Sequence, residues 1–202
     1  SLIRAPEWLS NRLGTYYLYF AHHQGEFIRL ATADRVEGPY TVYKPGVLPI
    51  RQFADPVLHV ASPDMHLDEE KREMRMYFHA HCRQWGRQLS FRAHSPDGIR
   101  FDIHPEPLGM PYFRVFFWRG AWYAFAKKGN EGTVIHRSPD GLSQFLPGPH
   151  FMPDSRHTAL WIEGETLYLF HSNYREIERI LVSTIDLSKP WQKWQPENTQ
   201  LL

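Results

Sequence analysis

The stretch Leu167-Tyr168-Leu169-Phe170-His171 is the last of four aromatic segments that follow one pattern along this chain of 202 residues. The three earlier segments are Tyr16-Tyr17-Leu18-Tyr19-Phe20, Arg75-Met76-Tyr77-Phe78-His79 and Trp122-Tyr123-Ala124-Phe125-Ala126. If the last phenylalanine of each segment is taken as equivalent, successive segments are 58, 47 and 45 residues apart. Aromatic residues favour β-strands, and a repeat of this length is typical of repeated sheets.

Each aromatic segment is flanked by further strand-like stretches. One stretch precedes each aromatic segment, at residues 2–8, 63–67, 112–118 and 158–162. Another follows each segment and ends at an aspartate, at residues 28–34, 89–97, 134–140 and 180–186. A short last strand closes each unit, as at residues 40–43 or 191–194. Four strands per repeat are typical of propeller blades. We therefore predict an all-β, single-domain β-propeller of four-stranded antiparallel blades at about residues 1–45, 54–105, 108–148 and 150–197.

Two nearly identical turns support this architecture. They are Ser95-Pro96-Asp97-Gly98 and Ser138-Pro139-Asp140-Gly141. Proline presets one turn dihedral, aspartate bonds back to the backbone, and glycine accepts a positive φ, so both stretches predict tight connections between antiparallel strands. The alternative fold is a β-sandwich with coincidental spacing.

Four repeats are compatible with two kinds of ring. Propeller sheets hide their edges by circular closure, so the chain forms either a four-bladed ring or part of a larger one that other residues or a partner chain complete. The second case predicts a homo-oligomer joined through an open propeller edge.

Composition narrows the functional classes. The 23 basic and 22 acidic residues leave a formal net charge of +1, which argues against a nucleic-acid partner. The longest apolar runs, residues 16–21 and 112–118, are much shorter than a membrane span of about 20 residues.

Cys82 is the single cysteine, so no intrachain disulfide can form. The start, residues 1–6, has no signal-peptide pattern, and we expect a cytoplasmic protein, although a mature secreted chain would look the same.

Several stretches resemble one known family. Residues 13–23, with residues 28–34 and Glu37-Gly38-Pro39-Tyr40, are similar to the opening blade of propeller glycoside hydrolases of the arabinanase and xylosidase type, glycoside hydrolase family 43. The resemblance continues in Ser62-Pro63-Asp64-Met65-His66, Tyr112-Phe113-Arg114-Val115-Phe116 and Ser155-Arg156-His157-Thr158-Ala159. It implies a five-bladed propeller, a polysaccharide or oligosaccharide ligand, and three acidic residues around a central funnel. It also implies a single cation, such as calcium, in the central channel.

The acidic signatures of that family are incomplete in this chain. Ser62 stands where the family has the aspartate of Asp-Pro, and Gly109 stands where it has the glutamate of Glu-Gly-Pro. The resemblance thus implies a glycosidase with an incomplete carboxylate set. The alternative is a non-catalytic module, derived from the same scaffold, that binds carbohydrate or a second copy of the chain.

Two aspartates are the candidate catalytic residues. Asp64 begins an innermost strand, and His66, two positions on, shares its face and is expected to hold sugar hydroxyls. The alternative for Asp64 is a turn aspartate that bonds local backbone. Asp55 precedes Pro56 and has the Asp-Pro form, but its place in a connection between blades favours a plain turn.

Four more residues are candidate substrate ligands. Arg114 interrupts an apolar strand, so it faces either a wet pocket or a structural ion-pair partner. Arg156 and His157 precede the fourth inner strand, where a sugar-hydroxyl ligand is expected. Trp85, in the presumed hairpin tip at residues 82–86, can stack on a sugar ring. The twelve histidines show no metal-binding spacing, and no protein metal site is predicted from them.

Overall fold

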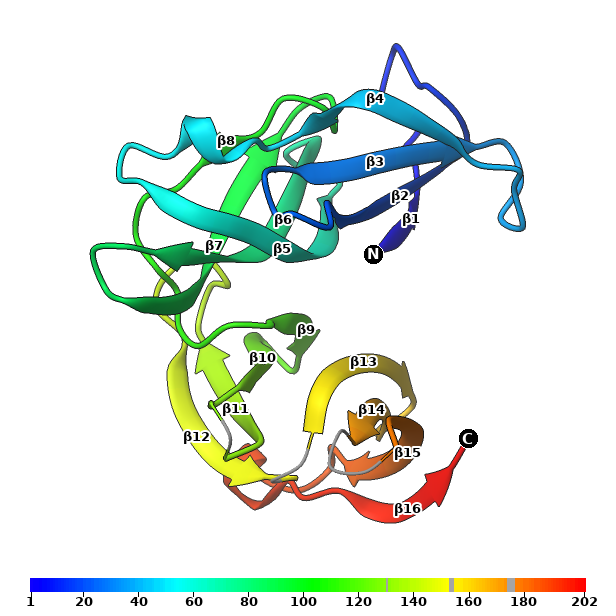
Figure 1. The fold of residues 1–202 in the computed structure, drawn as a ribbon. Helices are drawn as coiled ribbons and strands as arrows, with labels where there is room; N and C mark the ends of the chain where they lie inside the picture. Colours follow the sequence, from blue (N-terminus) through cyan, green and yellow to red (C-terminus); the bar gives the residue numbers. More distant parts are fainter. Residues whose placement is uncertain (130, 153–154, 174–176) are drawn as a thin grey trace. The chain divides into compact units, whose positions relative to one another are not determined.

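The structure is a computed structural model that describes residues 1–129, 131–152, 155–173 and 177–202. It contains four antiparallel sheets of four strands, each built from strands that are consecutive in the chain (Figure 1). This confirms the predicted all-β fold with four blade-type sheets. The chain divides into two units, Ser1–Leu108 and Gly109–Leu202, with two sheets in each.

Unit 1 contains the first two sheets. The first sheet consists of β1 (Leu2–Arg4), β2 (Tyr16–Ala21), β3 (Ile28–Ala33) and β4 (Thr41–Val47). After a 3-10 turn, η1 (Ile50–Gln52), the second sheet consists of β5 (Val57–Asp68), β6 (Glu73–Cys82), β7 (Arg87–Ser95) and β8 (Asp102–Ile103). The predicted inner strand at residues 63–67 is thus the last part of a longer strand.

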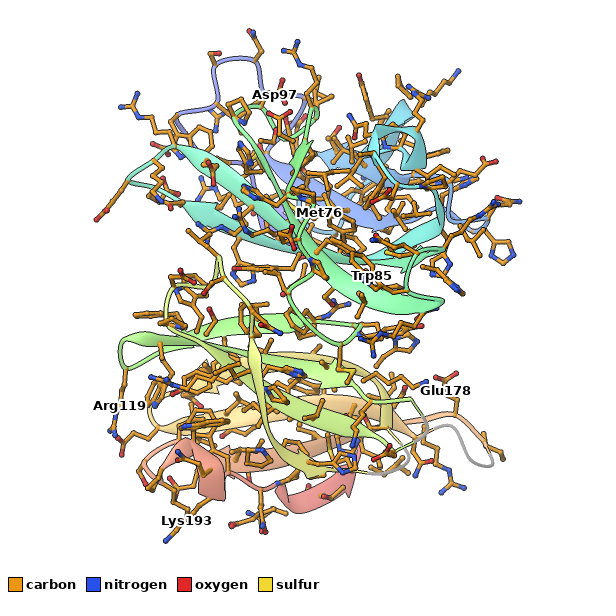
Figure 2. The ribbon with its side chains drawn as sticks, turned by 90° about the vertical axis from the view of Figure 1, so that its left-hand side faces the viewer. Met76, Trp85, Asp97, Arg119, Glu178 and Lys193 are labelled. Atoms are coloured by element: carbon orange, nitrogen blue, oxygen red, sulfur yellow. The ribbon has the colours of Figure 1, made fainter. Side chains whose placement is uncertain are left out.

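The core of unit 1 follows from strand alternation. In β6, Met74, Met76 and Phe78 are buried in a cluster that also contains Tyr17 and Tyr19 of β2 (Met76 is labelled in Figure 2). Successive side chains of a strand point to opposite faces. The odd-numbered residues from Glu73 to Tyr77 therefore lie on the other face of the sheet. One face of the second sheet therefore packs in the core of unit 1, and the other carries polar side chains.

Unit 2 contains the other two sheets. The third sheet consists of β9 (Arg114–Trp118), β10 (Ala121–Lys127), β11 (Thr133–Ser138) and β12 (Leu146–Phe151). The fourth consists of β13 (Ser155–Glu163), β14 (Thr166–Asn173), β15 (Arg179–Asp186) and β16 (Glu197–Leu201). Phe116, Tyr123 and Phe125 pack with Leu167 and Leu169 in its core.

The closing strand of the fourth sheet differs from the prediction. Residues 191–194 are not a strand, because Trp191–Lys193 forms the 3-10 turn η2 and the edge strand β16 follows it. The side chains at positions i and i+3 of such a turn lie on one side, and both tryptophan rings contact Tyr123, at centroid distances of 6.1 Å for Trp191 and 4.7 Å for Trp194. The indole Nε1 of Trp194 donates to the carbonyl of Lys189 at 2.9 Å. The aromatic pair thus anchors a connection in the core.

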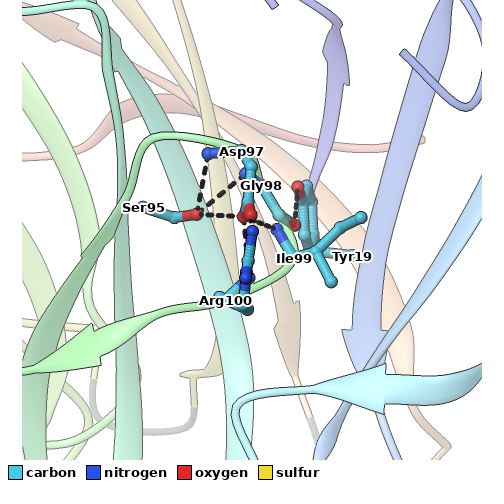
Figure 3. A network of polar contacts seen from close by, with 6 residues as sticks. All are labelled: Tyr19, Ser95, Asp97, Gly98, Ile99 and Arg100. Atoms are coloured by element: carbon cyan, nitrogen blue, oxygen red, sulfur yellow. Dashed lines mark hydrogen bonds and ion pairs between the residues drawn. The ribbon is translucent and has the colours of Figure 1, made fainter. Parts of the chain in front are cut away.

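The two Ser-Pro-Asp-Gly stretches form the expected turns. The hydroxyl oxygen of Ser95 accepts hydrogen bonds from the backbone N–H groups of Asp97 and Gly98, at 3.2 and 2.8 Å (Figure 3). The Asp97 carboxylate accepts two more, from Ile99 at 2.9 Å and Arg100 at 2.8 Å. The hydroxyl of Tyr19, on β2, donates to the carbonyl of Gly98 at 2.8 Å and so ties this turn to the neighbouring sheet.

The described helices are the two short 3-10 turns, and neither has the length or the apolar content of a membrane-spanning helix.

Candidate functional site

Asp64 and His66 meet on the polar face of the second sheet. The carboxylate Oδ2 of Asp64 lies 3.1 Å from Nε2 of His66. Both side chains are mostly buried but keep some contact with solvent, at 15% exposure for Asp64 and 23% for His66. The pair is a carboxylate held in a defined orientation by a neighbouring imidazole and still open to solvent.

An irregularity in β5 sets the position of this pair. The register of β5 against β6 shifts between Ala61 and Asp64, and Ser62 has a φ of 54°. Pro63 has no N–H to contribute to the ladder. Irregularities of this type re-aim the side chains that follow them. The Ser62-Pro63 dipeptide therefore determines which way Asp64 and His66 face.

Positive charge and a tyrosine surround the pair. Across the sheet, Asp64 lies opposite Tyr77, which lies opposite Arg92, and in the next row His66 lies opposite Arg75. The ring centroids of His66 and Tyr77 are 5.3 Å apart. Burial raises the pKa of Tyr77, an increase to which Asp64 adds and which Arg75 and Arg92 oppose.

Sequence reasoning missed Tyr77, Arg75 and Arg92. The signal was present in β6, where Arg75, Tyr77, His79 and His81 alternate with apolar residues. A period-two pattern places all four on the face opposite the core.

The nearest carboxylate along the same face of β5 is Asp68. Its Oδ2 lies 3.5 Å from Nη2 of the buried Arg75 and 3.7 Å from Nζ of Lys71. It is four residues from Asp64, a separation of roughly 13 Å along an extended strand. Glycosidase carboxylate pairs are roughly 5–9.5 Å apart, so Asp64 and Asp68 are too far apart to act together.

Three histidines lie on this face near the other end of β5. The ring of His59 is 5.5 Å from that of His79 and 5.9 Å from that of His81, measured between centroids. Burial lowers the pKa of His59, and the neighbouring His81 lowers it further. Over the described ranges, no group of three or more histidine, cysteine or acidic side chains is arranged to hold a metal ion. The calcium ion implied by the resemblance stays a prediction.

Asp55 and Trp85 come together at a different place in unit 1. Both line a pocket of about 270 Å³ that is bounded by the end of η1, the start of β5, the hairpin between β6 and β7, the middle of β7, and β8. Cys82 lies in its wall and is buried, which raises the pKa of the thiol, and Asp55 raises it further. Asp55 belongs to this pocket and not to the polar face that carries Asp64.

The remaining candidates lie in unit 2. Arg114 is the first residue of β9, and its Nη1 donates to the carbonyl of Phe113 at 2.7 Å. The ring of His157, an exposed residue of β13, lies 5.4 Å from the ring of Tyr112. Lys127 places its Nζ 5.9 Å from the centroid of that same Tyr112 ring. Arg156 lies in β13, but its side chain is outside the described residues.

No family model matches the chain. It is 31% identical, over 232 aligned positions, to an uncharacterized protein of Acanthamoeba polyphaga mimivirus. The alignment includes 98% of this chain but 64% of the viral protein. The chain therefore spans less than two thirds of the length of this curated relative.

Solved structures of glycoside hydrolases share the fold. The β-xylosidase RS223 superposes with a TM-score of 0.66 at 17% identity, covering 93% of this chain and 71% of the xylosidase. The exo-β-1,3-galactanase of Phanerochaete chrysosporium gives a TM-score of 0.67 at 14% identity, covering 90% and 47%. The α-L-arabinofuranosidase of Clostridium thermocellum gives 0.64 at 14% identity, covering 93% and 69%. The fold is thus that of the propeller glycoside hydrolases, as the sequence resemblance implied.

Proposed function

We propose that this chain is a glycoside hydrolase-like propeller protein that binds polysaccharide or oligosaccharide, with Asp64 as the principal ligand for a sugar hydroxyl. The observation that carries the proposal is the solvent-accessible Asp64–His66 pair on a sheet of a glycoside hydrolase fold. Folds host many functions, so the site and not the fold alone must carry the inference.

The chemistry of the pair suits a sugar. A carboxylate accepts hydrogen bonds from hydroxyl groups, and its two oxygens offer several acceptor positions. The contact with His66 restrains the Asp64 side chain, so less conformational entropy is lost when a sugar binds. His66 and Arg92, which is only partly buried on the same face, supply donors for the remaining hydroxyl oxygens.

A ligand role for Asp64 requires fewer groups than cleavage does. Glycoside hydrolysis needs one carboxyl group to protonate the leaving oxygen and a second to act as base or nucleophile. On β5, Asp68 is roughly 13 Å from Asp64 and is engaged with Arg75 and Lys71. Asp64 therefore supplies one of the two functions at most, and a ligand role needs only one.

Glycosidase activity is the second candidate. It is favoured by the names of the structural neighbours, which include a β-xylosidase and an α-L-arabinofuranosidase. In that case Asp64 is the base, and another residue supplies the acid.

One pair of assays tests both candidates. Binding of xylo-, arabino- and galacto-oligosaccharides is measured by calorimetry, and hydrolysis is measured with aryl glycosides. Because a hydrogen bond to a charged group contributes about 1.5–3 kcal/mol, Asp64→Asn should weaken binding by roughly 10- to 100-fold. Asp102→Asn is the matched control, since Asp102 lies on the same sheet and its side chain is 83% exposed.

The outcomes are distinct. Weakened binding in Asp64→Asn, with no turnover in the unmodified protein, supports a binding protein. Turnover that disappears in Asp64→Asn moves the assignment to a glycosidase. Equal affinity in Asp64→Asn and the unmodified protein, or no binding of any oligosaccharide, would overturn the role of Asp64.

A further inference from the structure

We infer that the pocket beside Trp85 is a second carbohydrate subsite, which holds one neutral sugar ring stacked on the indole with a hydroxyl bonded to Asp55. The inference rests on the proposed function, because it assumes a carbohydrate ligand. It adds a site that is separate from Asp64.

The walls of the pocket suit the flat apolar face of a sugar ring. The indole of Trp85 is 40% exposed and lies 6.3 Å from the ring of Phe91 at an interplanar angle of 34°. Phe53 packs edge-on against Phe91 at 5.8 Å. Ligand sites are typically apolar clefts with a few polar groups that orient the ligand. A cavity of about 270 Å³ is of a size for a single ring and not for a long chain.

The hairpin that carries Trp85 is held in place by its own backbone. Residues 83–86 connect β6 to β7, and the N–H of Gly86 donates to the carbonyl of Arg83 at 3.2 Å. Gly86 has a φ of 59°, a conformation that glycine adopts without steric cost. The turn therefore restrains the backbone at Trp85, which is labelled in Figure 2.

Asp55 provides the polar contact. It lines the pocket, and within the described part of the chain it takes part in no hydrogen bond or ion pair. Its carboxylate is thus available to accept a hydrogen bond from a ligand.

The lining of the pocket combines an aromatic wall with one charged acceptor. Asp55 is the one charged side chain among the described lining residues, and the exposed Arg83 and Arg87 of the hairpin are not among them. A polyhydroxylated ring matches both the aromatic wall and the acceptor.

The register of the second sheet separates this pocket from the first site. Val57 lies opposite Cys82, and Phe91 lies opposite Phe78, which puts the pocket on the core-facing side of the sheet. Asp64 lies opposite Tyr77, on the other side. The two sites can therefore be tested independently.

Ligand titrations followed by NMR provide the test. Xylose, arabinose and galactose are added to the ¹⁵N-labelled full chain, with the Trp85 indole signal assigned from Trp85→Phe. We expect millimolar binding that shifts this signal and the backbone amides of residues 82–87, an affinity typical of a single small ring. The backbone amides report binding in the variants that lack the indole. Trp85→Ala should weaken binding at this site by at least about tenfold, Asp55→Ala should weaken it severalfold, and Trp85→Phe should retain part of the affinity. Gln84→Ala, in the same turn, is the matched control and should not change it.

Each outcome decides between the two proposals. Loss of the sugar-induced shifts of the backbone amides of residues 82–87 in Trp85→Ala and Asp55→Ala, while Asp64→Asn retains them, supports the second subsite. Sugar-induced shifts confined to the surroundings of Asp64, unchanged in Trp85→Ala, overturn the subsite and leave the proposed function standing. Absence of any sugar binding overturns the proposed function and the subsite together.

Discussion

His136 is a buried histidine that stays neutral in the folded protein. It lies in β11, is 2% exposed, and its ring packs 5.5 Å from that of Phe113. Burial disfavours the charged imidazolium and lowers the pKa of His136 from 6.5 to about 4, although a hydrogen bond with the backbone of Val134 opposes the shift. The unfolded chain therefore takes up a proton at a higher pH than the folded chain does.

This difference predicts an acid-labile unit 2. The contribution of a neutral His136 is fully present above pH 6.5 and is lost as the pH falls from 6.5 toward 4. A pKa difference of this size corresponds to about 3 kcal/mol. In His136→Gln, the free energy of unfolding should therefore fall less between pH 7 and pH 4 than it does in the unmodified protein, as measured by chemical denaturation. His150→Gln, at an exposed position, is the control, and an equal acid sensitivity in the His136 variant would contradict the prediction.

At the scale of the element, the side chains of Ser-Pro-Asp-Gly build the turns between strands. The Asp140 carboxylate accepts backbone hydrogen bonds from Leu142 and Ser143, both at 2.8 Å, and one from the hydroxyl of Ser138 at 3.0 Å. Burial alone would raise the pKa of Asp140, but these hydrogen bonds outweigh it and hold the pKa well below its usual value. The turn thus depends on an ionised aspartate.

Removal of that carboxylate should loosen the connection between β11 and β12. We expect Asp140→Ala to lower the free energy of unfolding by about 1–2 kcal/mol, because the turn N–H groups lose their acceptor. The pKa of Asp140 is lower in the folded chain than its unfolded value of 3.8, so the ionised carboxylate stabilises the folded protein above pH 3.8. The gap in the free energy of unfolding between the variant and the unmodified protein should therefore shrink as the pH falls below 3.8. Denaturation from pH 7 to pH 3 measures this gap. A gap that is constant with pH would show that the carboxylate charge is not the cause.

At the scale of the whole molecule, each unit has a hydrophobic core of its own. Phe78 and Phe91 are buried in the core of unit 1, and Phe116 and Phe125 are buried in that of unit 2. Each core is lined by the inner faces of two successive sheets, because a single sheet cannot bury its apolar face alone.

Separate cores predict separate responses to a cavity. Phe125 is fully buried, and truncation of such a side chain costs about 3–5 kcal/mol. Phe125→Ala should therefore lower hydrogen-exchange protection in the strands of unit 2 more than in β6 and β7 of unit 1, and Phe78→Ala should do the reverse. Mass-spectrometric hydrogen exchange on peptides from each unit measures this. Equal loss of protection in both units would show that they unfold as one.

The four sheets, their order along the chain and several of the turns between their strands could be predicted from the sequence. These features depend on residues that are near neighbours in the chain: the alternation of β6 around Met76 and Phe78, and the hydrogen bonds that Asp97 and Asp140 make within three residues. The closing strand was misplaced because Trp191 and Trp194 have strand-like composition, and only their packing on Tyr123 makes them a 3-10 turn.

Which of the candidate residues meet depends on how the strands pair and the sheets pack. Asp64 and His66 were predictable as a pair because they are two positions apart on one strand. Asp55 and Trp85 are 30 positions apart, and their shared pocket depends on strand register and on the packing of η1 against the second sheet. The contact of His157, in β13, with Tyr112, in the segment before β9, likewise joins residues that are far apart in the chain. Local rules of alternation and turn chemistry contain no information on such long-range contacts, which arise only when the sheets pack.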